Sequence, residues 1–191
     1  MIMKRVLFMA IAIIAAATVV GCASKERWND EHRRELRDEV GAWREMVYLE
    51  NLDDAEFEDF SGDVVEAIEI DYPIYTTFVE LPAKGDTVEV YVVSTIVNRL
   101  QTDAHNMRNI YPYPLLVSEG ILPPGLDIQA QRAFYDCFTR RVNANFKSVG
   151  DFFNALVDDT APDSKIEQMQ QQCASDLFDW NISEDETIFF D

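Results

Sequence analysis

Residues 25–49 read KERWNDEHRRELRDEVGAWREMVYL and carry the clearest helical pattern in the chain. Their large apolar side chains recur at spacings of eight, four, three and four residues, which puts them on one face of a helix: Trp28, Leu36, Val40, Trp43 and Val47. Charged residues occupy the other side, where Asp30 with Arg34 and Arg34 with Asp38 are i,i+4 pairs of opposite sign. The stretch therefore predicts an amphipathic helix over 25–49.

Capping residues and apolar spacing continue this helical pattern along the chain. They predict further helices over 63–70, 73–81, 127–146, 149–157 and 163–180. Between them we expect an acid-rich connection at 51–62 and an irregular segment at 109–126, where YPYP and PPG restrict the backbone.

Residues 86–110 allow two interpretations. Their many β-branched side chains favour a hairpin that turns around Lys84-Gly85-Asp86. However, no glycine or proline interrupts the run, and Asp86 with Glu89 three positions later resembles a capping box. We expect a long buried helix here, with a hairpin at about 74–97 as the alternative.

Together these patterns predict an all-α fold, a single helical domain of about six helices over residues 25–180. The alternative is an α+β fold with the hairpin just described. No internal repeat or linker divides the chain, and residues 181–191 form an acidic tail.

The first 22 residues resemble the signal of a bacterial lipoprotein. Lys4 and Arg5 precede an apolar run over 6–20, which is shorter than the roughly 20 residues that span a membrane. Val19-Val20-Gly21-Cys22 is similar to a lipobox, in which a small residue precedes a cysteine that is lipidated and becomes the new N-terminus. The resemblance implies removal of the signal peptide 1–21, lipid such as palmitate on Cys22, and a tether of residues 22–24.

The same resemblance implies a location in the cell envelope. The residue after the cysteine is Ala23, not the aspartate associated with inner-membrane retention. In a cell with two membranes this implies the outer membrane, facing the periplasm. The resemblance covers the signal alone and says nothing of the domain that follows.

The mature chain is strongly acidic. The sequence of 191 residues has 35 Asp and Glu against 16 Lys and Arg, a net charge of −19, and loss of Lys4 and Arg5 with the signal takes it to −21. Charge of this sign repels nucleic acid, so no nucleic-acid partner is expected, whereas a basic protein suits it. A hydrophobic share of 48% excludes wholesale disorder.

Lipidation of Cys22 leaves two cysteines, Cys137 and Cys173, in a compartment that is oxidising in many bacteria. Each lies on the apolar stripe of a predicted helix. We expect them to form a disulfide, with two buried free thiols as the alternative. A closed loop of this size, about 37 residues, stabilises a fold by roughly 3 to 4 kcal/mol on chain-entropy grounds.

No motif for catalysis or cofactor binding stands out. The chain has only His32 and His105, and it lacks HExxH, CxxC and a glycine-rich phosphate loop. The acids from Asp53 to Glu58 lack the glycine that a calcium-binding loop needs at its sixth position. We therefore expect no catalytic residue, no metal and no cofactor.

Two surfaces are candidates for binding a partner. The acid-rich connection offers its carboxylates to a basic protein: Asp53, Asp54, Glu56, Glu58 and Asp59. The Tyr-Pro segment offers Tyr111 and Tyr113, which supply contact area at low entropic cost on a stiff backbone. The alternatives are a solvated acidic loop and tyrosines that cover the core.

The leading hypothesis is a non-catalytic envelope lipoprotein that binds another protein, basic or of the envelope, through one of these surfaces. An immunity or exclusion factor against a basic toxin is one example of this class. The alternatives are an envelope hydrolase that uses paired carboxylates and a small-ligand carrier with a cavity between helices.

Overall fold

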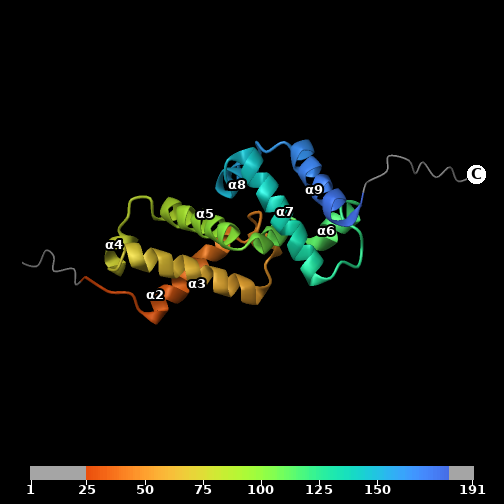
Figure 1. The fold of residues 1–191 in the computed structure, drawn as a ribbon. Coiled ribbons are helices and arrows are strands. Elements are labelled where there is room, and N and C mark those ends of the chain that lie inside the picture. Colours follow the sequence, from red (N-terminus) through yellow and green to blue (C-terminus); the bar gives the residue numbers. More distant parts are fainter. Residues whose placement is uncertain (1–24, 181–191) are drawn as a thin grey trace, which may run out of the picture.

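The computed structural model describes residues 25–180 and folds them into helices (Figure 1). In chain order they are α2 (Asp30–Val40), η1 (Gly41–Trp43), η2 (Leu49–Asn51), α3 (Asp54–Asp71), α4 (Tyr75–Val79), α5 (Lys84–Thr102), η3 (Ala104–Asn109), α6 (Tyr113–Ser118), α7 (Ile128–Phe146), α8 (Val149–Val157) and α9 (Asp163–Phe178). The predicted signal peptide, Cys22 with its tether and the acidic tail 181–191 lie outside the described residues.

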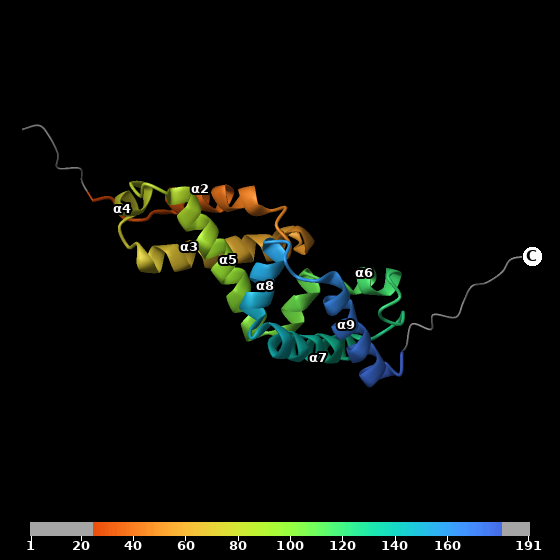
Figure 2. The same ribbon diagram turned by 90° about the horizontal axis from the view of Figure 1, so that it is seen from above.

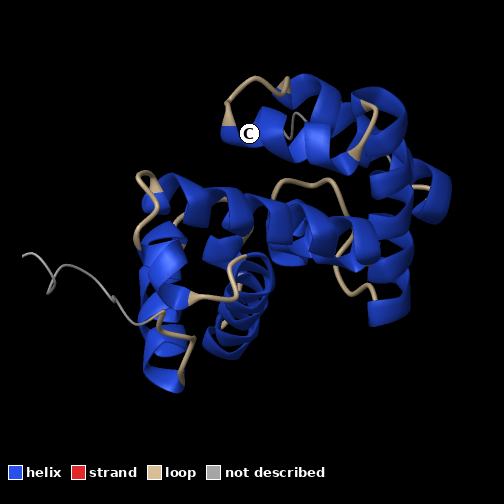
Figure 3. Cartoon of the chain, turned by 90° about the vertical axis from the view of Figure 1, so that its left-hand side faces the viewer, coloured by secondary structure: helices blue, strands red, loops and turns tan. Residues whose placement is uncertain are grey.

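The predicted all-α fold is confirmed. Residues 25–180 form eight α-helices and three short 3₁₀ helices, against the six or so expected. Figure 3 shows these helices joined by loops without a strand, and the single strand-like contact in this part of the chain is a bridge between Arg27 and Ile74. None of its helices is both long and apolar enough to cross a membrane.

The helices form two groups that α5 joins. In the first group α3 contacts both α2 and α5, and in the second α7 contacts η3, α8 and α9. Helix α5 reaches both, because it also contacts α8 and η3 (Figure 2). One continuous core runs through both groups, from Phe60 on α3 to Phe138 and Phe152 in the second group.

The prediction of one helix over 25–49 is wrong in its bounds. The side chain of Asn29 accepts a hydrogen bond from the backbone of His32, so the helix begins at Asp30. Trp28 lies before it, buried, and donates to the backbone oxygen of Tyr72 at 2.7 Å. After Val40 the chain continues as η1 and turns, and Tyr48 adopts a positive φ of 85° that no helix can contain.

The expected acid-rich connection at 51–62 is instead the first half of α3. Asp53 caps this helix through a capping box with Glu56, ten residues before the predicted start at Asp63. The apolar residues Phe60, Val64 and Ile68 recur every four positions and are fully buried. The cap and this stripe outweigh the acidic composition on which the prediction of a connection rested.

The long-helix interpretation of the valine-rich segment is confirmed, and the hairpin at 74–97 is wrong. Helix α5 buries Val88, Val92 and Ile96 on one face. The predicted capping box is wrong, because α5 begins before Asp86 and ends at Thr102, where η3 takes over. The segment 109–126 contains the short helix α6, in which Pro114 occupies the second position and needs no amide hydrogen.

The predicted pairing of Cys137 with Cys173 is present. Cys137 on α7 and Cys173 on α9 lie with their sulfur atoms 2.11 Å apart and their Cα atoms 5.9 Å apart. Both are buried in the core. The bond fastens the last helix to the helix that it packs against.

Candidate functional site

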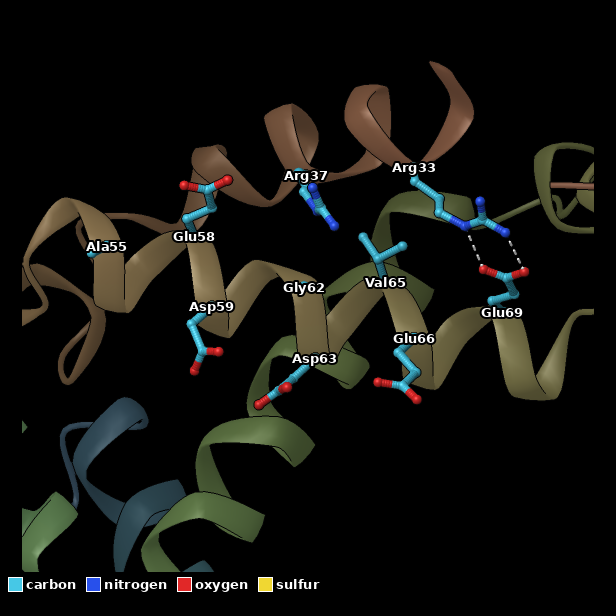
Figure 4. Close-up of a pocket in the computed structure, with 10 residues that line it drawn as sticks. All are labelled: Arg33, Arg37, Ala55, Glu58, Asp59, Gly62, Asp63, Val65, Glu66 and Glu69. Atoms are coloured by element: carbon cyan, nitrogen blue, oxygen red, sulfur yellow. Dashed lines mark hydrogen bonds and ion pairs between the residues drawn. The ribbon is translucent and has the colours of Figure 1, made fainter. Parts of the chain in front are cut away.

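The largest hollow that the charged residues line is a groove between α2 and α3, with a volume of about 700 Å³ (Figure 4). We call it the α2–α3 groove, and its lining residues are Arg33, Arg37, Ala55, Glu58, Asp59, Gly62, Asp63, Val65, Glu66 and Glu69. The two arginines come from α2 and all the carboxylates come from α3 (Figure 4). Gly62 helps to keep it open, because a Cβ at this position meets no atom within 4 Å.

One end of the groove is closed by an ion pair across the two helices. The Nε and NH2 atoms of Arg33 donate to the two carboxylate oxygens of Glu69, each at 2.8 Å (Figure 4). These hydrogen bonds lower the pKa of Glu69 and raise the pKa of Arg33. Glu69 is therefore ionised and engaged, so it cannot act as a general acid.

Two further carboxylates of the groove share one guanidinium on α5. Arg99 donates to Asp63 through Nε at 2.9 Å and to Asp59 through NH2 at 2.7 Å, and it lies over the ring of Phe60. Burial alone lowers the pKa of Arg99, but its hydrogen bonds to Asp63 and Asp59 outweigh burial and raise it. The positive charge between the two acids stabilises both as anions, unlike a hydrolytic pair in which one carboxyl must hold a proton.

Three charged members of the groove keep their charge free. Within residues 25–180, Glu58, Glu66 and Arg37 have no ion-pair partner within 4.0 Å. Arg37 points from α2 toward α3 (Figure 4), and the two glutamates lie eight residues apart on α3, about 12 Å along its axis. The groove therefore offers two separated negative charges and one positive charge to a partner.

The structure spreads the predicted acidic candidates over several roles. Asp53 is the N-cap of α3, Asp54 lies 3.5 Å from Arg44, and Glu56 pairs with Arg108. Glu58 and Asp59 line the groove, where Asp59 is already bound to Arg99. Of the five candidates, only Glu58 is left with neither a capping role nor an ion pair in the described part of the chain.

The Tyr-Pro candidates face inward. The hydroxyl of Tyr113 donates to the backbone oxygen of Pro123 and accepts from the backbone nitrogen of Leu126, both at 2.9 Å, and so holds the following turn. The ring of Tyr111 packs edge-on against Phe138, with centroids 5.6 Å apart, and burial raises the pKa of its phenol. Both tyrosines are half-buried, which agrees with the alternative that they cover the core.

The sequence analysis missed the arginines that neutralise α3. Arg33, Arg99 and Arg108 reach acids 36 to 52 residues away in the chain, and no local pattern announces such pairs. One signal was available for Arg99, which lies three residues after Ile96 and so extends the apolar stripe of α5. A guanidinium on a buried stripe needs a carboxylate partner, which makes it a marker of a long-range ion pair.

Neither a metal site nor a known relative points to a reaction. Among residues 25–180 no group of three or more His, Cys, Asp or Glu side chains could hold a metal ion together. No family model, curated protein or solved structure matches this chain. The function must therefore be inferred from the residues themselves.

Proposed function

We propose that this chain is a non-catalytic cell-envelope lipoprotein, held on a membrane by lipid on Cys22, that binds a basic protein through the α2–α3 groove. The lipobox-like sequence before Cys22 supports the anchor, and the net charge of −19 supports a basic partner. The observation that carries the proposal is that Glu58 and Glu66 line a groove without an internal cation.

The distinction between paired and unpaired acids is what makes the groove selective. A partner that binds Asp59, Asp63 or Glu69 must compete with an arginine already in place, whereas Glu58 and Glu66 are available at no such cost. The same arginines hold α3 against α2 and α5, so the free carboxylates stand on a supported helix. Binding that depends on two exposed charges is weakened by salt, because ions screen them.

Co-purification tests the groove. We expect a basic protein to be recovered with the wild-type chain from detergent-solubilised membranes at low salt, and the yield to fall about tenfold with E58Q/E66Q, as for a loss of 1.4 kcal/mol. The matched control is E80Q/E89Q, which removes two exposed acids of α4 and α5 that have no ion pair in the described chain. Equal recovery with both double variants, or no partner for the wild-type chain, contradicts the proposal.

Palmitate labelling tests the anchor separately. We expect the wild-type chain to incorporate labelled palmitate and to sediment with membranes, and Cys22→Ser to do neither. Cys137 and Cys173 cannot accept the label while they are joined in a disulfide. A wild-type chain that never labels contradicts the lipoprotein part of the proposal and leaves the groove part standing.

A further inference from the structure

A second cleft, distant from the groove, lies between the end of α6 and the start of α9. It has a volume of about 350 Å³, and we call it the α6–α9 cleft. Its lining residues are Tyr111, Glu119, Ile121, Asp163, Ile166, Glu167 and Gln170. This is where the Tyr-Pro segment meets the last helix, two regions far apart in the chain.

The charge of this cleft is negative and uncompensated. Glu119, Asp163 and Glu167 are exposed carboxylates, no lysine or arginine is among the lining residues, and none of the three acids has an ion pair within residues 25–180. The α2–α3 groove differs, because arginines bind three of its five acids. Three free carboxylates around one small cleft favour a bound cation.

A buried side chain at the cleft also lacks a partner. Gln170 is only 3% exposed, and its Nε2 atom is buried with no hydrogen-bond acceptor. Buried donors are nearly always paired, and an unpaired one is costly to the fold. Since Gln170 lines the cleft, an acceptor on a ligand can satisfy this amide.

Tyr111 adds a third polar group. Its phenol has its pKa raised by burial first and then by the charges of Asp163 and Glu119, which shows that both acids act on it. The hydroxyl therefore keeps its proton at neutral pH and can donate a hydrogen bond. The apolar atoms of Ile121 and Ile166 complete the lining and suit an aliphatic stem.

We infer that the α6–α9 cleft binds one lysine side chain presented by a peptide or protein. The ammonium, a compact charge with three donors, lies among Glu119, Asp163 and Glu167. The carbonyl of the lysine backbone accepts the free amide hydrogen of Gln170. A lysine residue supplies both the cation that the acids need and the acceptor that Gln170 lacks, which a simple metal ion does not.

The test uses the protein purified from membranes in an uncharged detergent and a defined probe, Nα-acetyl-lysine N-methylamide. We expect the probe to shift the side-chain amide resonance of Gln170 in glutamine-labelled protein, and the norleucine analogue, which lacks the charge, to leave it unmoved. A Gln170 resonance that moves with neither compound, or equally with both, overturns the inference.

Matched variants locate the contacts. We expect E119Q/E167Q to weaken the probe about tenfold or more, as for the loss of one charge-assisted hydrogen bond, whereas the control E31Q/E45Q changes it less than about twofold. We expect Q170M to weaken the probe but not pentylamine, which has the charge and no carbonyl. Undiminished binding by E119Q/E167Q, or equal loss in the control, overturns the site.

The outcome does not depend on the function proposed for the groove. We expect E58Q/E66Q to leave binding of the lysine probe unchanged, because neither residue lines the α6–α9 cleft. Weakening by this groove variant equal to that by E119Q/E167Q contradicts a local site and points to a general effect of charge.

Discussion

Arg99 lies between Asp59 and Asp63 with its side chain 19% exposed, while the two acids are 75% and 48% exposed. A pair in this position falls between two limits, since exposed ion pairs contribute almost nothing and breaking a buried pair costs several kcal/mol. The open carboxylates can turn to water when the arginine is lost, but the contacts of its stem with Phe60 cannot be replaced.

We therefore expect Arg99→Met to lower the free energy of unfolding by about 1 to 2 kcal/mol, measured by urea denaturation. The control is Arg34→Met, because Arg34 is exposed and has no ion pair in the described residues, and its effect is expected within about 0.5 kcal/mol. Equal losses in the two variants contradict the role assigned to Arg99.

The pair of Arg33 with Glu69 makes stability depend on pH. Arg33 lowers the pKa of Glu69 below its ordinary value of 4.5, so this carboxyl binds a proton less readily when folded than when unfolded. Its contribution is present above pH 4.5 and is lost as the pH falls through the lower pKa of the folded state. We expect part of the loss of stability on acidification below pH 4.5 to disappear in Arg33→Met, in urea titrations at a series of pH values. A pH profile parallel to that of the wild-type chain contradicts it.

Single residues also explain why the bounds of the first helix escaped prediction. The pattern over 25–49 continues to Val47, but Asn29 starts the helix late and the positive φ of Tyr48 lies just beyond the turn that follows it. Trp28 belongs to the apolar stripe by spacing, yet its indole bonds to Tyr72, 44 residues away. Spacing records which side chains are buried, and it does not record which neighbour buries them.

At the scale of elements, prediction succeeded where the signal was local. Helix α7 begins after its Asp127 cap and α9 begins at Asp163, and both carry apolar stripes whose cysteines meet. The start of α3 was missed because its acids were read as a solvated loop. Their partners on α2, α5 and η3 come from distant parts of the chain, so the groove between α2 and α3 could not be foreseen either.

Gly62 is an element-scale weakness that serves the groove. It lies in the interior of α3, where glycine costs roughly 0.5 to 1 kcal/mol relative to alanine, and a Cβ there meets nothing within 4 Å. We expect Gly62→Ala to raise the free energy of unfolding by about that amount in urea denaturation, and to reduce recovery of the basic partner because the methyl group enters the groove.

The control for this change is Gly85→Ala in the first turn of α5, where an added Cβ also meets nothing within 4 Å. It should leave partner recovery unchanged, since Gly85 is outside the groove. A stabilised Gly62→Ala variant that recovers the partner as well as Gly85→Ala does contradicts the groove as the binding surface.

On the scale of the whole molecule, the two groups of helices place their distinctive features at opposite ends. Helix α4 lies at one end and α6, with the α6–α9 cleft, lies at the other (Figures 1 and 2). The described chain enters at the α4 end, where the backbone oxygen of Glu26 accepts from Thr76 and Arg27 bridges to Ile74. Cys22 precedes Lys25 by three residues, a span of at most about 11 Å. Lipid on Cys22 therefore brings α4 close to the bilayer and directs the cleft away from it.

This orientation can be measured with two matched positions. Val79 on α4 and Leu115 on α6 are both 42% exposed, so a photoreactive residue at either meets solvent to the same degree. On membranes that carry the lipidated chain, we expect lipid adducts from position 79 and few from position 115. A linker of about 20 Gly and Ser residues after Ser24 adds roughly 25 Å of reach and should reduce the adducts at 79, because the domain is then free to leave the surface. Equal adducts at both positions, or adducts at 79 that the linker does not reduce, contradict the short tether as the cause of orientation, whereas a chain that never takes up palmitate contradicts the anchor itself.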